Sequence, residues 1–76
     1  MENEITFKAM FRNSGFVSDT VRVCISEKIA AYHITEKPSS NGKFISFTVT
    51  LPADADDLVD GLTASLSAIE GFMMMI

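Results

Sequence analysis

The chain has 76 residues, too few for two domains, so we expect residues 1–76 to form one domain around one core. Hydrophobic residues make up 47% of it, which excludes a disordered tail. Ten acidic residues against six basic ones give a net charge of -4, which makes nucleic acid an unlikely partner because such binders present a basic surface to phosphate.

The compartment is inferred from the cysteine and the first residues. Cys24 is the single cysteine, so no internal disulfide and no thiolate metal cage can form. Residues 1–4 carry two acids, unlike the basic start of a signal peptide. No stretch approaches the roughly 20 apolar residues of a membrane span. We therefore expect a cytoplasmic protein without a membrane segment, metal or cofactor.

The first predicted elements are a strand and a helix. Residues 5–11 alternate between apolar and polar side chains, which predicts a half-buried strand. Asn13 or Ser14 is predicted to cap the helix that follows, which ends near Lys28. Its apolar stripe, spaced near 3.6 residues, consists of Phe16, Val17, Val21, Cys24 and Ile25.

A hairpin is predicted in the middle of the chain. Residues 29–36 form its first strand, and the strand 43–51 has Ile45, Phe47, Val49 and Leu51 facing the core. Between them, residues 37–42 contain Pro38, which cannot donate to a sheet ladder, and an Asn-Gly pair typical of tight reversals.

A second helix and a last strand complete the chain. Residues 53–67 show a helical apolar stripe, with aspartates at 54, 56, 57 and 60 suited to the positive end of the helix dipole. Residues 72–76 are predicted to be a buried strand. Phe72, Met74 and Ile76 would point into the core, and Met73 and Met75 would lie on the other face.

The order β-α-β-β-α-β predicts an α+β, ferredoxin-like sandwich. In this fold a four-stranded antiparallel sheet carries both helices on one face. The other sheet face would be open, flat, mixed and partly apolar. We expect it to present Lys8, Met10, His33, Phe44, Ser46, Thr48, Met73 and Met75.

Three segments resemble the YbeD-like family of small uncharacterised bacterial proteins. They are residues 37–44 followed by Ser46 and Thr48, residues 7–10, and the closing residues 69–76. The resemblance implies a bacterial protein with a ferredoxin-like fold similar to regulatory ACT domains. It also implies a role in regulation, with lipoate metabolism suggested for one branch of the family, and no catalytic residue.

We therefore expect a non-enzymatic regulatory or interaction module that forms a homodimer. A small effector or a protein partner would bind the open face, with Met73 and Met75 as an adaptable apolar part of it. The 37–43 hairpin would form the rim and cradle an anion through its backbone N–H groups. The rim side chains are Lys37, Ser39, Ser40 and Lys43.

Two other functions are weighed against this one. A small acyl-phosphate hydrolase would use Arg12 to hold an oxyanion, but the glycine-rich loop of such enzymes is missing from residues 12–15. A single-stranded nucleic-acid binder would stack bases on Phe44, but it is the single aromatic on that face and the net charge is wrong.

The remaining candidates have structural explanations. His33 lacks a second ligand at a suitable spacing, so we expect an ordinary surface histidine. Cys24 lies on the helix stripe and is expected to act as a small hydrophobe. The aspartates at residues 54–60 lack the spacing of a calcium-binding loop.

Overall fold

The structure is a computed structural model that describes residues 4–76, so most of the acidic start, residues 1–4, from which the signal-peptide argument was drawn lies outside the described residues. Seven elements follow one another along the chain. They are β1 (Glu4–Arg12), α1 (Val17–Ser26), β2 (His33–Pro38), β3 (Phe44–Pro52), the 3-10 helix η1 (Ala53–Leu58), α2 (Val59–Ser67) and β4 (Phe72–Met75).

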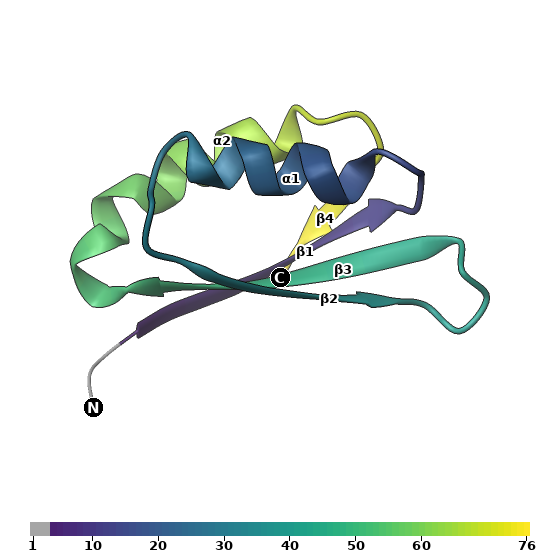
Figure 1. Cartoon of the computed structure of the whole chain (residues 1–76), viewed down its shortest axis with the longest axis horizontal. Helices are drawn as coiled ribbons and strands as arrows, with labels where there is room; N and C mark the ends of the chain where they lie inside the picture. The colour runs from purple at the N-terminus through teal and green to yellow at the C-terminus, as the bar shows by residue number, and fades with distance from the viewer. Residues whose placement is uncertain (1–3) are drawn as a thin grey trace.

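The four strands form one antiparallel sheet in the order β2-β3-β1-β4. Both helices lie on the same face of this sheet, and no helix of residues 4–76 covers the other face (Figure 1). The predicted ferredoxin-like β-α-β-β-α-β arrangement is therefore confirmed. No helix in this part of the chain is long and apolar enough to cross a membrane.

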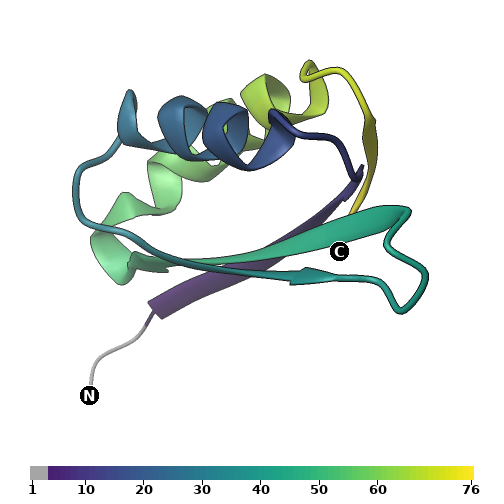
Figure 2. The ribbon, with the colours of Figure 1, turned by 45° about the vertical axis from the view of Figure 1, so that its right-hand side comes forward.

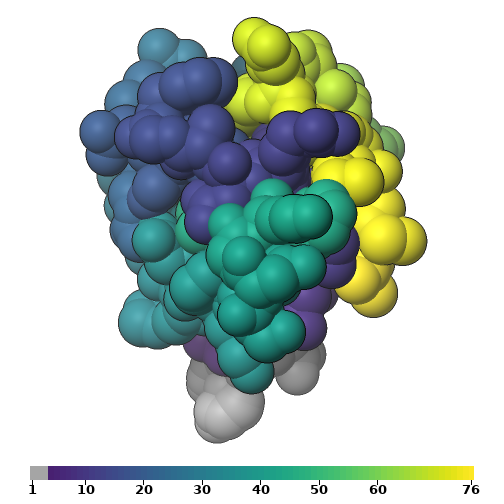
Figure 3. Space-filling view, turned by 90° about the vertical axis from the view of Figure 1, so that its right-hand side faces the viewer, coloured from purple at the N-terminus to yellow at the C-terminus, as the bar shows by residue number. Residues whose placement is uncertain are grey.

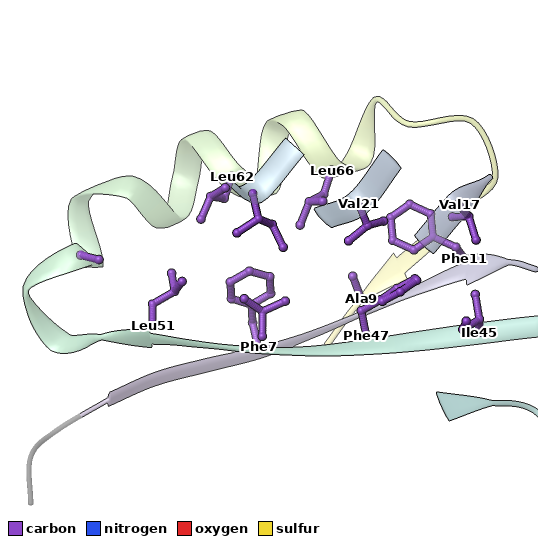
Figure 4. Packing of buried hydrophobic residues seen from close by; sticks show 13 residues of the cluster. Phe7, Ala9, Phe11, Val17, Val21, Ile45, Phe47, Leu51, Leu62 and Leu66 are labelled. Atoms are coloured by element: carbon purple, nitrogen blue, oxygen red, sulfur yellow. The ribbon is translucent and has the colours of Figure 1, made fainter. Parts of the chain in front are cut away.

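The core lies between the sheet and the helices (Figure 4). Every second residue of β1 and β3 points into it, as the alternation predicts, and Phe11 packs edge-to-face against Phe47 and Phe72. On the helix side of the core, α1 contributes Val17, Val21 and Ile25. The 3-10 helix η1 contributes Ala55, and α2 contributes Leu62 and Leu66.

Helix α1 begins later than predicted and is not capped by Asn13 or Ser14. Its N-cap is Phe16, which makes no side-chain capping bond and is 51% exposed, so Phe16 is not part of the buried stripe. Asn13 instead bonds to the β2–β3 hairpin: its backbone N–H donates to Lys43 O (2.9 Å) and its side-chain amide to Gly42 O (3.0 Å). The cap prediction was wrong because it considered only neighbouring residues, whereas the hydrogen-bond partners of Asn13 are distant in sequence.

Strand β2 starts four residues after the predicted start. The amides of Lys28 and Ile29 both donate to Ile25 O, so the chain continues as a helical turn past the end of α1. At its other end β2 extends through Pro38, which was predicted to stop it. Because β2 is an edge strand, the missing N–H of proline does not interrupt the sheet.

The second helix is divided into two parts. Residues 53–58 form the 3-10 helix η1, and Ala55 departs from helical geometry with φ -96° and ψ 15°. The α-helix begins only at Val59. Ala55 is buried, so this tight turn still contributes to the core.

A bulge in β4 reverses the predicted orientation of its methionines. The opposed residues of β1 and β4 are Phe11 with Phe72, Met10 with Met74, and Ala9 with Met75. Met73 is therefore an extra residue without an opposed partner. Met75 packs against the core and not on the open face, whereas Met74 and Ile76 are 49% and 68% exposed and not buried.

Candidate functional site

The open face of the sheet is organised in rows that cross the strands. Lys37 of β2 lies opposite Ser46 of β3, which lies opposite Met10 of β1. The next row places Lys8 opposite Thr48. These side chains share one face because residues opposed across an antiparallel pair point the same way.

An open hollow of about 300 Å³ lies where these rows meet. Ser46 is one of the residues that line it, and the two residues opposed to Ser46, Met10 and Lys37, have longer side chains. The Ser46 hydroxyl donates to Lys37 O at 3.4 Å. The lining residues are Lys8, Met10, Lys37, Pro38, Ser39, Phe44, Ile45 and Ser46.

The lining of the hollow is basic, although the chain as a whole is acidic. It contains two lysines and no acid. Arg12, opposite Phe44, adds a third cation on the same face. Most acidic residues of the described part of the chain lie elsewhere, on the helices and their loops. The exceptions are Glu4, at the far end of β1, and Glu36. The carboxylate of Glu36 reaches α1, where it accepts a hydrogen bond from Ser18 (2.7 Å) and pairs with Arg22 (3.0 Å).

The hairpin rim extends past the ends of the helices (Figure 2). Its N–H groups are largely used within the turn. The amide of Ser39 donates to Phe44 O, that of Gly42 to Ser39 O and that of Lys43 to Asn41 Oδ1. The Phe44 amide donates to Ser39 Oγ at 3.1 Å. Three N–H groups of residues 37–43 thus already have partners, and the anion cradle through this hairpin stays a prediction.

Several predicted site residues lie away from the hollow. His33 and Thr48 are on the open face, as predicted, but neither lines the hollow. Ser40 and Lys43 are exposed near the tip of the hairpin, which protrudes in the space-filling view with β4 to one side of it (Figure 3). Met73 is 46% exposed. The hollow thus brings together Lys8, Lys37, Ser39, Phe44 and Ser46 from the predicted set.

Met10, Pro38 and Ile45 line the hollow but were not predicted as site residues. Met10 carried a signal, since the alternation of β1 already places it on the open face. Nothing in the sequence indicated that Pro38 or Ile45 would line a site. Pro38 was predicted to end a strand, and Ile45 was predicted to face the core. In the pairing of β2 with β3 they are opposed to each other, next to the Lys37–Ser46 pair, so they border the hollow although Ile45 itself belongs to the core.

The other chemical candidates form no second site. Cys24 is partly buried, and burial raises the pKa of its thiol above the usual 9.0, which disfavours the reactive thiolate. Within residues 4–76, no three His, Cys, Asp or Glu side chains are close enough together to hold a metal ion. Arg12 ends β1 and its amide donates to Gly71 O at 2.8 Å.

Comparisons with known proteins give a family and a fold. A family model described as "Protein of unknown function (DUF493)" matches residues 3–76, which include all three segments that resemble the YbeD-like family; the two are the same family. The solution structure of protein HP0495 from H. pylori is similar with a TM-score of 0.77 and 13% identity, over 99% of this chain and 81% of that one. At that identity the likeness shows the fold alone. No curated protein is significantly similar in sequence.

Proposed function

The chain belongs to the family described as "Protein of unknown function (DUF493)", and we propose that it is a non-enzymatic regulatory or interaction module. It acts by binding a small effector or a protein partner on the open sheet face, with the 37–43 hairpin as the rim. The observation that carries this proposal is the basic hollow on the uncovered face of an acidic domain.

Charge separation supports binding at this face. A domain with net charge -4 gains nothing in solubility from clustering its cations, whereas a local positive field attracts acidic ligands and orients their approach. Lys8 and Lys37 belong to strands separated by β3 and are offset by two residues along them, so their backbones are about 12 Å apart. Two long, mobile ammonium side chains at that spacing can reach one bound group from opposite sides.

The test is co-purification from the native host of the wild-type chain and of a Lys8→Glu, Lys37→Glu variant, with mass spectrometry of retained proteins and metabolites. The matched control is Lys28→Glu with Ala64→Glu and Ser67→Glu, three exposed positions on the helix layer, which changes the net charge equally. We expect specific species that the wild type and the control retain and the open-face variant loses. Identical retention by all three proteins contradicts the proposal.

We further propose that the module pairs with a second copy through the free edge of β4. The other edge strand, β2, carries Glu36, Lys37 and Pro38, and charges and proline protect an edge from pairing. Phe72–Met75 has no charge, so antiparallel pairing about a twofold axis opposes no like charges. The exposed Met73, Met74 and Ile76 would add apolar contacts.

Sedimentation equilibrium over a concentration series tests this pairing. We expect a wild-type dimer that Met74→Lys shifts toward monomer, because the new charge lies beside the shared edge. Thr35→Lys, on the open face of β2, is the matched control and leaves the dimer intact. A wild-type protein that stays monomeric at every concentration refutes the pairing.

A further inference from the structure

We infer that the ligand of the hollow is a small organic anion, a carboxylate or a phosphate monoester, that carries one compact apolar group. This inference rests on the proposed function and gives it a chemical class. Its basis is the set of side chains that line the hollow with Ser46, in which two lysines lie beside the apolar side chains of Met10 and Phe44.

The acid group is assigned to the two lysines. Lys8 and Lys37 are both exposed and both line the hollow, one from each strand that flanks β3. An anionic oxygen between them makes charge-assisted hydrogen bonds, which are about twice as strong as neutral ones. A neutral polar ligand lacks this attraction.

The apolar group is assigned to Met10 and Phe44. Both side chains are half-buried, lie on the open face and line the hollow, so part of their apolar surface faces it. A thioether adapts its shape to a bound group, and a ring offers a flat face. Inorganic phosphate has no apolar group, so it would leave this apolar surface exposed to water.

The size of the hollow limits the ligand. About 300 Å³ is at the lower end of the volumes of ligand sites, so the apolar group is of the order of one ring. The hollow exists because Ser46 is short. A larger side chain at this position would fill it without altering the charge or the core, since residue 46 points away from the helices.

Phenyl phosphate and benzoate are suitable probes, titrated into labelled protein and followed by amide chemical shifts. We expect both to shift the amides of Lys8, Met10, Lys37 and Ser46, and to bind more weakly as salt is added. Inorganic phosphate and benzyl alcohol, each lacking one half of the chemistry, should bind at least about tenfold more weakly. Whichever of phenyl phosphate and benzoate binds more tightly then shows whether the acid group of the ligand is a phosphate or a carboxylate.

Ser46→Leu is the decisive variant, because it removes the space and keeps both lysines. It should abolish the shifts, whereas Thr50→Leu, on the same strand and face but outside the hollow, should bind like the wild type. Amide spectra without probe show that both variants are folded. Equal binding of benzyl alcohol, or binding that survives Ser46→Leu, overturns the inference.

Failure of the inference and failure of the proposed function are distinguishable. If neither acid binds but the Lys8→Glu, Lys37→Glu variant still loses its co-purified species, the open face binds something else and the assigned chemistry is wrong. If the acids bind in the hollow but co-purification is unaffected, the inferred chemistry holds and the proposed regulatory role does not.

Discussion

Neighbouring residues of β3 lie on opposite faces of the sheet and have opposite environments. Phe47 and Val49 are fully buried beneath the helices, whereas Ser46 and Thr48 are half-buried on the open face. On the covered face each side chain must fill a volume shared with the helices. On the open face a short side chain leaves a hollow that nothing else in residues 4–76 fills. One face of the sheet therefore determines stability, and the other is available for binding.

The largest expected effect tests this division directly. Phe47→Ala removes a ring that packs against Phe11, and loss of a buried phenylalanine costs about 3–5 kcal/mol. That is a large share of the stability of so small a domain. Thr48→Ala, the adjacent residue on the open face, should change stability by less than about 0.5 kcal/mol. Urea unfolding measures both, and similar losses in the two variants would erase the distinction between the faces.

The next effect concerns how β4 enters the sheet. Gly71 has φ +95° immediately before β4, a conformation that a side chain disfavours by about 1–2 kcal/mol. Gly71→Ala should destabilise the domain by that amount, although the space near Arg12 is sufficient for a methyl group.

Gly61→Ala is the matched control for Gly71→Ala. Gly61 lies in the exposed middle of α2 with nothing within 4 Å of an added Cβ, so alanine should stabilise the domain by about 0.5–1 kcal/mol. Thermal or urea unfolding shows the sign. Equal shifts in the same direction would mean that the conformation of Gly71 is not what positions β4.

Most of the fold could be predicted because the two periodicities are strong. The alternation of β1 and β3 gave the correct inward side for Phe7, Phe11 and Phe47, and the spacing of Leu62 and Leu66 gave the inward side of α2. The errors lie at element ends, where contacts distant in sequence decide. Asn13 bonds to the hairpin and so does not cap α1. A single bulge residue in β4 exchanged the sides of Met74 and Met75.

The candidate site could be predicted only in part, for a related reason. Periodicity assigns a residue to a face, so Lys8, Ser46 and Thr48 were correctly placed together on the open face. It does not give the register between strands. Whether Lys37 lies opposite Ser46 or Thr48 decides which residues surround the hollow, and that register is a property of the folded hairpin.

The smallest expected effect concerns Glu36, the β2 residue that contacts the helix layer. Hydrogen bonds from Ser18 and then from Arg22 hold the pKa of its carboxyl below the usual 4.5. A carboxyl with a lowered folded-state pKa stabilises the fold above its unfolded value and loses that contribution as the pH falls through the lowered one. Because the pair is solvent-accessible, we expect less than about 1 kcal/mol.

Urea unfolding of the wild type and Glu36→Gln, repeated from neutral pH to well below 4.5, measures this contribution. The wild type should be the more stable protein at neutral pH, and its advantage should shrink as the carboxylate is protonated. Glu70→Gln, on the loop between α2 and β4, is the control for loss of a negative charge alone. An advantage that persists unchanged at acid pH would mean that packing, and not the ionised carboxylate, joins β2 to α1.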